Sequence, residues 1–114
     1  MIRVKRVYDR PEQSDGSRIL VDRLWPRGLS KERAKIDVWL KDVAPSNGLR
    51  KWFAHNPKKW VEFKKRYFKE LASKKDLIEF ILNTKKQGAV SLLYGARDEK
   101  FNNAIALKSY IESK

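Results

Sequence analysis

The chain has 114 residues, a length at which one hydrophobic core and a single domain over residues 1–114 are expected. Hydrophobic residues make up 41% of it and charged residues 36%, which favours a globular protein with a densely ionic surface over a disordered one. It lacks cysteine and has His55 as its one histidine, so disulfides, thiolate catalysis, Cys-containing zinc sites and sites with two imidazoles are excluded.

The net charge of the chain indicates which kinds of partner it can attract. With 27 Lys and Arg against 14 Asp and Glu, the charge is +13, and a surface of that kind attracts phosphates, nucleic acid or anionic membranes. Adaptation to heat is the competing explanation of the same lysines. No run approaches the roughly 20 consecutive apolar residues of a membrane span, so no membrane partner is expected and the protein is predicted to be cytoplasmic.

The first part of the chain predicts short strands and loops. Alternating apolar and basic side chains predict a strand over residues 2–7, followed by an exposed loop over 8–17. A second strand opens at residues 19–21, reaches Trp25 and stops at Pro26. Ser30 can cap a short helical turn. Residues 36–43 alternate as a third strand does, although the start of a helix fits the same stretch.

The second part predicts helices around one more strand. Helices are expected over residues 48–55, 58–71, 74–87 and 101–113, and a buried strand over 89–94. Ser46 or Asn47 would cap the first helix, and Asn56 with Pro57 would begin the second. This order predicts an α/β fold, a small three-layer sandwich whose mostly parallel sheet carries helices on both faces.

In folds of this class the ligand crevice lies beyond the carboxyl ends of the strands, and two polar segments of this chain follow predicted strands. Arginines held in a rigid turn suit bidentate recognition of a phosphate or carboxylate, and a helix start offers free N–H groups. The predicted ligand-binding residues are Arg23, Trp25, Arg27, Ser46, Arg50, Tyr94, Arg97, Asp98 and Asn102.

Each of these residues also has a purely structural interpretation. Asp22 would pair with a neighbouring arginine, Trp25 would lie in the core, and Asn102 or Asp98 would cap the last helix. His55 and Asp98 are weak candidates for a catalytic acid or base, because no nucleophile with an activator is visible. No spaced set of metal ligands is found, so no metal is predicted, and the cofactor, if any, is unknown.

Three separated segments resemble one known family. VDRLWPRGLSKE, the APS of residues 44–46 with LRKWFAHNPKKWVEFKKRY, and SLLYGARDEKFNNA are similar to the YeaO-like branch of the domain-of-unknown-function family 488. The resemblance implies a small three-layer α/β protein, typically prokaryotic and cytoplasmic, with no implied activity. The family pattern usually has Asp where this chain has Asn56, which makes a dyad of His55 with an adjacent carboxylate less expected.

Two functions therefore stay open at this point. The leading prediction is a protein that binds a small phosphate-bearing or carboxylate ligand in an Arg- and Trp-lined crevice, with any reaction left open. The alternative is a non-specific nucleic-acid-binding module that uses the lysine-rich helices. Enzyme activity and the oligomeric state are not predicted from these patterns.

Overall fold

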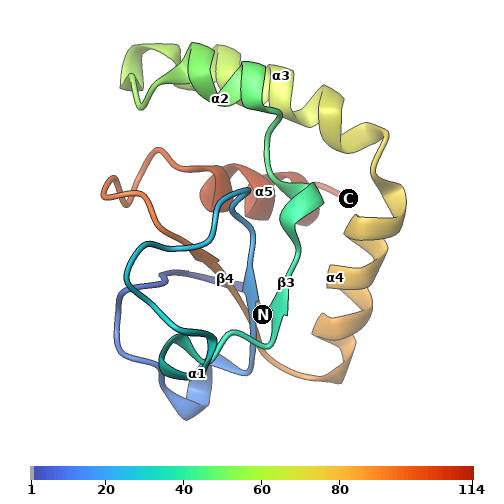
Figure 1. Ribbon diagram of the computed structural model, residues 1–114. Coiled ribbons are helices and arrows are strands. Elements are labelled where there is room, and N and C mark those ends of the chain that lie inside the picture. Colours follow the sequence, from blue (N-terminus) through green and yellow to red (C-terminus); the bar gives the residue numbers. More distant parts are fainter. Residues whose placement is uncertain (1) are drawn as a thin grey trace.

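The chain builds a four-stranded sheet in which the two central strands end side by side (Figure 1). The computed structural model describes residues 2–114. Its strands are β1 (Ile2–Arg6), β2 (Ser17–Leu20), β3 (Val38–Trp39) and β4 (Val90–Tyr94), in the order β1-β4-β2-β3. All three pairings are parallel, and Leu20 lies opposite Leu93. The predicted α/β class with a parallel sheet is confirmed, and the carboxyl ends of β2 and β4 form the middle of one sheet edge.

Five helices fill much of the remaining described chain, and three of them begin at predicted caps. They are α1 (Lys31–Ala34), α2 (Asn47–Phe53), α3 (Trp60–Ala72), α4 (Lys75–Gln87) and α5 (Asn103–Glu112), with short 3-10 turns at Gln13–Asp15, Lys41–Val43 and Pro57–Lys59. The side chains of Ser30, Ser46 and Asn102 accept backbone N–H groups at the starts of α1, α2 and α5. Asn56 and Pro57 begin the 3-10 turn that leads into α3.

Two predicted strands are shorter than the sequence indicated. The backbone N–H of Val21 still donates to Leu93, but the chain then leaves the sheet, so residues 22–25 form a loop and not the end of a strand. The third strand ends at Trp39, because Val43 donates back to Leu40 and closes a 3-10 turn. Because both strands end early, the polar residues that follow them lie at the carboxyl edge of the sheet and not within it.

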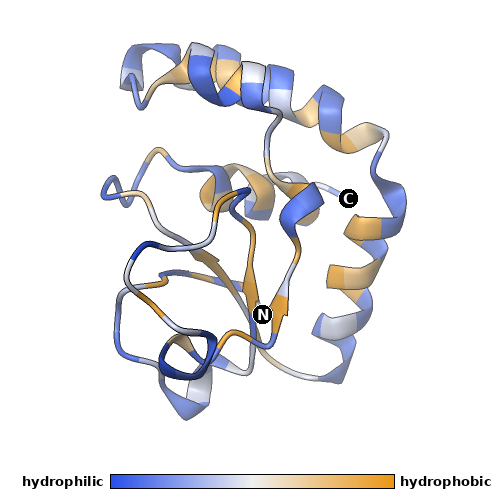
Figure 2. Cartoon of the chain, viewed as in Figure 1, coloured by the Kyte–Doolittle hydropathy of each residue, from blue (hydrophilic) through white to orange (hydrophobic). Residues whose placement is uncertain are grey.

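The two faces of the sheet are covered unequally. The alternate residues Ile19, Val21, Leu92 and Tyr94 pack into a large core with α2, α3, α4 and α5. Their neighbours Leu20 and Leu93 point to the other face, where α1 and loops cover them in a smaller cluster. Figure 2 shows the apolar residues concentrated in the strands and the polar residues on the outer turns of the long helices.

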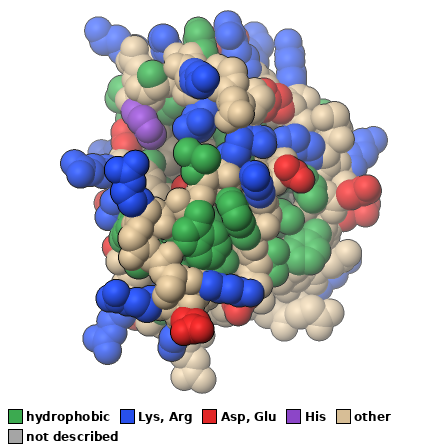
Figure 3. Space-filling view, in the orientation of Figure 1, with side chains coloured by type: hydrophobic (Ala, Val, Ile, Leu, Met, Phe, Trp, Pro, Cys, Tyr) green, Lys and Arg blue, Asp and Glu red, His purple; other side chains and the backbone are tan. Residues whose placement is uncertain are grey.

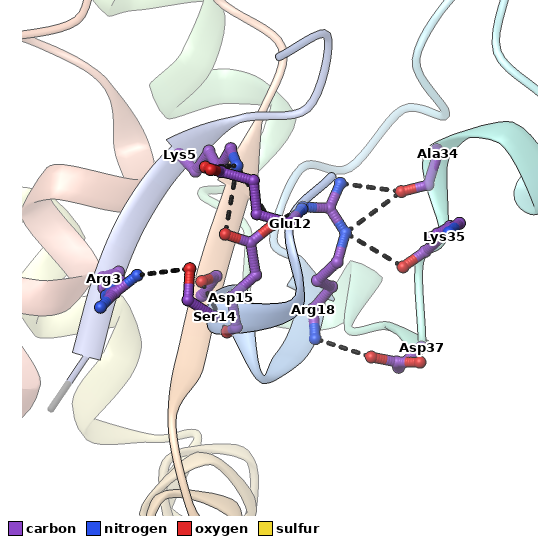
Figure 4. A network of polar contacts seen from close by, with 10 residues as sticks. Arg3, Lys5, Glu12, Ser14, Asp15, Arg18, Ala34, Lys35 and Asp37 are labelled. Carbon is purple, nitrogen blue, oxygen red and sulfur yellow. Dashed lines mark hydrogen bonds and ion pairs between the residues drawn. The ribbon is translucent and has the colours of Figure 1, made fainter. Parts of the chain in front are cut away.

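Buried ion pairs replace apolar packing at one end of that smaller face (Figure 4). Asp15 and Arg18 are both almost fully buried and form an ion pair, and Lys5 donates to Asp15 from β1. The Arg18 guanidinium also donates to the carbonyls of Ala34 and Lys35 at the end of α1. Gly16, at φ +67°, fits this tight turn because a Cβ there would collide with the backbone of Ala89. The network joins β1, β2 and α1.

Replacing Asp15 with Asn is expected to destabilise the protein by about 3–5 kcal/mol, because the Arg18 guanidinium would stay buried without its charge partner. Burial opposes ionisation of Asp15, but hydrogen bonds from Glu12, Lys5 and Arg18 hold its pKa below the ordinary 3.8. Its contribution is therefore complete above pH 3.8 and is lost as the pH falls through the lower folded-state pKa. Urea denaturation at several pH values measures both effects.

Glu12→Gln is the matched control, since Glu12 also binds Lys5 but is 65% exposed. Its loss is expected to change the free energy of unfolding by less than about 1 kcal/mol. Equal effects of the two substitutions would contradict the role assigned to the buried pair.

Candidate functional site

A cavity of about 300 Å³ lies at the carboxyl ends of β2 and β4. Its walls come from five segments: the loop after β2, residues 44–55, one residue of α3, the loop after β4, and the start of α5. The lining residues are Asp22, Arg23, Leu24, Ala44, Pro45, Arg50, Phe53, His55, Phe63, Gly95, Ala96, Phe101, Asn102 and Asn103. Its position is the one at which parallel α/β sheets place their ligands, and its volume suits a small molecule.

The carboxylate of Asp22 forms part of the cavity wall. Its Oδ2 accepts the backbone N–H of Gly95 at 2.8 Å, and its Oδ1 accepts the side-chain amide of Asn103 at 3.1 Å. The same Asn103 amide donates to the carbonyl of Val21 at 3.0 Å. Asp22 thus joins the ends of β2 and β4 to the first residue of α5.

Among residues 2–114, Asp22 belongs to none of the ion pairs found within 4 Å. Burial raises the pKa of Asp22, although the hydrogen bonds from Gly95 and Asn103 and the positive charges of Arg50 and His55 counteract the rise. A carboxylate that is desolvated without a directly paired cation is costly in a purely structural position. Its location in a cavity is therefore a functional signal.

The side chains of Arg23, Arg50 and His55 line this cavity together with Asp22. Arg23 donates through Nε to Pro45 at 3.3 Å and through Nη2 to Ala44 at 3.2 Å, which fixes its guanidinium along the 44–45 wall. Arg50 is exposed and makes a long 3.4 Å contact to Asn47, so most of its five donors face solvent or the cavity. His55 completes the group at the end of α2.

The backbone around His55 is unusual. Ala54 and His55 both have positive φ angles, +46° and +56°, which side-chain-bearing residues adopt infrequently. This left-handed pair ends α2 and brings His55 to the wall of the cavity. In Figure 3 the imidazole stands at the edge of a face on which hydrophobic side chains occupy the centre and Lys and Arg side chains surround them.

Of the predicted ligand-binding residues, Arg23, Arg50 and Asn102 line the cavity, as does the weak catalytic candidate His55. Trp25 and Arg27 do not. The Trp25 indole donates to Leu29 and packs edge-on against Trp39, while the exposed Arg27 contributes its carbonyl to the hydroxyl of Tyr8. Of these three residues of the turn 22–28, Arg23 therefore lines the cavity, whereas Trp25 and Arg27 do not.

Four more predicted residues lie away from the cavity lining. Ser46 is held by Glu70, whose carboxylate accepts both its N–H and its hydroxyl, so a carboxylate already occupies that helix start. Tyr94 is buried in the core, and burial raises its pKa. Arg97 is exposed. Asp98 closes a turn by accepting the N–H groups of Phe101 and Lys100, which lower its pKa.

The sequence prediction missed Asp22, Asn103 and the aromatic walls. The structural interpretation paired Asp22 with a neighbouring arginine, but its carboxylate accepts hydrogen bonds from Gly95 and Asn103, more than 70 residues further along the chain. The aromatic wall consists of Phe53, Phe63 and Phe101, whose helical spacing signalled core packing only. A polar residue directly after a buried strand was the available signal for Asp22.

The described residues hold no cluster of three or more His, Asp or Glu side chains that fits a metal ion. Over the same residues, no helix is long and apolar enough to span a membrane.

The pKa values of the Asp22 and Asp98 carboxyls are expected to depart in opposite directions from their common ordinary value of 3.8. Asp22 should take up its proton above pH 3.8, because burial disfavours its charged form, and Asp98 below it, because two backbone N–H groups favour its charged form. Carbon-13 NMR of the side-chain carboxyls measures both values. The reverse order would show that Asp22 is not desolvated.

The comparisons with known proteins agree on one family. The family model described as "Inactive DUF488-N3 subclade" matches residues 1–114. The chain is 41% identical over 112 residues to the "Uncharacterized protein YeaO" of Escherichia coli, covering 98% of this chain and 97% of that protein. It is 46% identical over 78 residues to an uncharacterized protein of Mycobacterium tuberculosis, covering 68% of this chain and 66% of that one. No solved structure matches it. The chain therefore belongs to the DUF488 family, in the DUF488-N3 subclade described as inactive.

Proposed function

We propose that this protein binds a small ligand carrying a phosphate or carboxylate group in the cavity beyond β2 and β4. The observation that supports the proposal most is the meeting of Arg23, from the loop after β2, with Arg50 and His55, from α2 and its end, at one cavity. The net charge of +13 strengthens the attraction of any anion toward this site.

The side chains divide the cavity into a polar part and an apolar part. Arg50 has donors available for an anion, and Arg23 is already oriented by the carbonyls of Ala44 and Pro45. Phe53, Phe63 and Phe101 offer aromatic carbon surface for an uncharged body of the ligand. The expected ligand therefore has an anionic end and an apolar or aromatic end.

Binding without turnover fits the site better than catalysis does. The family is described as an inactive subclade. Asp98, one of the two weak catalytic candidates, uses its carboxylate to hold the turn before α5. His55 has no hydrogen-bonded carboxylate among the described residues that would orient it as a base.

The alternative, nucleic-acid binding by the lysine-rich helices, has less support. Cations on that surface are partly engaged within the chain: Lys59 donates to the carbonyl of Trp52, and Arg66 pairs with Glu62 and lies over the Trp52 ring. Such contacts use donors that a phosphate backbone would otherwise receive.

Arg50→Gln is expected to weaken the binding of ribose 5-phosphate about tenfold or more, because a charge-assisted hydrogen bond contributes roughly 1.5–3 kcal/mol. Isothermal titration calorimetry and amide chemical shifts measure the affinity and locate the bound phosphate. The expected shifts fall on Arg23, Arg50 and His55.

Lys51→Gln is the matched control, since Lys51 is the next residue of α2, carries the same charge and does not line the cavity. It should leave the affinity within about twofold. Equal weakening by both substitutions would mean that net charge alone attracts the ligand. Tight, strongly salt-dependent binding of a random oligonucleotide, with no ribose 5-phosphate bound, would favour the nucleic-acid alternative.

A further inference from the structure

The hydrogen-bond acceptors of Asp22 indicate which chemical class of ligand the cavity binds. This inference rests on the proposed function. Each Asp22 oxygen accepts one hydrogen bond from the described residues, Oδ2 from Gly95 and Oδ1 from Asn103. A carboxylate offers about four acceptor positions, so each oxygen keeps capacity for a second donor. Asp22 lines the cavity, and a ligand there can therefore meet two parallel acceptor atoms.

Two side-by-side acceptors select a group with two side-by-side N–H donors. The edge of guanine that carries N1–H and the N2 amino group has this arrangement, and so has a guanidinium ion. Free guanidinium compounds are cations, however, and Arg23, Arg50 and His55 line the same cavity in a chain of net charge +13. Electrostatics therefore disfavours the cationic ligand and favours one that also carries an anion.

The remaining cavity surface suits the rest of such a molecule. The cavity wall includes the rings of Phe53, Phe63 and Phe101. Phe53 and Phe63 are almost fully buried and stack on each other with centroids 4.4 Å apart, so the partly exposed Phe101 is the aromatic side chain beside which a planar ring can lie. Arg50 is exposed, where a phosphate attached through a sugar would reach it from the mouth of the cavity.

We infer that the ligand of this cavity is a guanine nucleotide, whose base edge donates to Asp22 while its phosphate binds Arg50 and Arg23. Asn103 acts as a positioning residue, because its amide fixes Oδ1 of Asp22 and the carbonyl of Val21 at once. Adenine lacks a donor at N1, and hypoxanthine lacks the amino group, so both bases lose at least one of the two contacts.

The test uses the wild-type protein with four probes, the 5′-monophosphates of guanosine, inosine and adenosine and ribose 5-phosphate, each titrated by calorimetry. Guanosine monophosphate should bind at least tenfold more tightly than adenosine monophosphate and ribose 5-phosphate, with inosine monophosphate in between. A specific readout is the amide resonance of Gly95, whose N–H donates to Asp22: the guanine base should shift it and ribose 5-phosphate should not.

Asp22→Asn should remove the discrimination among the bases, because an amide presents one acceptor and one donor instead of two acceptors. Asp76→Asn, a change of the same kind at an exposed residue of α4, is the control and should preserve the preference. The comparison of nucleotides on the wild-type chain decides the question even if Asp22→Asn does not fold.

The titrations distinguish a failure of the guanine assignment from a failure of the proposed function. If ribose 5-phosphate binds at the cavity and guanosine monophosphate gains less than tenfold over adenosine monophosphate, the anion site stands and the guanine assignment is wrong. If none of the four phosphates binds, the proposed function fails and this inference fails with it.

Discussion

The hydrogen bonds of the Asp22 carboxylate hold together the part of the molecule on which the account depends. Strands β2 and β4 are neighbours in the sheet, but the chain diverges where they end. Asp22 bridges this divergence by accepting from Gly95 after β4 and from Asn103 at the start of α5. Together with the hydrogen bond from Asn103 to the carbonyl of Val21, this bridge sets the separation of the loops that carry Arg23 and Asn102. The same desolvated carboxylate that joins them also faces the cavity, so structure and binding share one group.

The fully buried carboxylate of Asp15 contrasts with the half-buried one of Asp22. Asp15 lies under the other face of the sheet and is compensated by Arg18 and Lys5, so its pKa is lowered. Asp22 has hydrogen bonds but no directly paired cation among the described residues, so burial raises its pKa. Compensated buried charge is consistent with a structural role, whereas uncompensated charge in a cavity is typical of functional sites.

Local patterns predicted the elements of this fold better than its site. The caps Ser30 and Ser46, the Asn56-Pro57 pair and the buried strand at 90–94 depend on neighbours in sequence, and the structure has them. The site depends on contacts between residues 22, 95 and 103, which no local pattern encodes. The same limit explains why Trp25 and Arg27 were grouped with Arg23: adjacency along the turn did not show that their side chains diverge.

Basicity alone does not make this chain a nucleic-acid-binding protein, since its lysine-rich helices place much of the charge on solvated outer faces (Figure 2). The distinguishing feature is the cavity in which two arginines, a histidine and a half-buried carboxylate meet. A crystal structure of the protein grown in phosphate tests this most directly. The account predicts phosphate density between Arg50 and His55, within hydrogen-bond distance of Arg50. Phosphate bound only along the lysines of α3 and α4, with this cavity holding water alone, would contradict it.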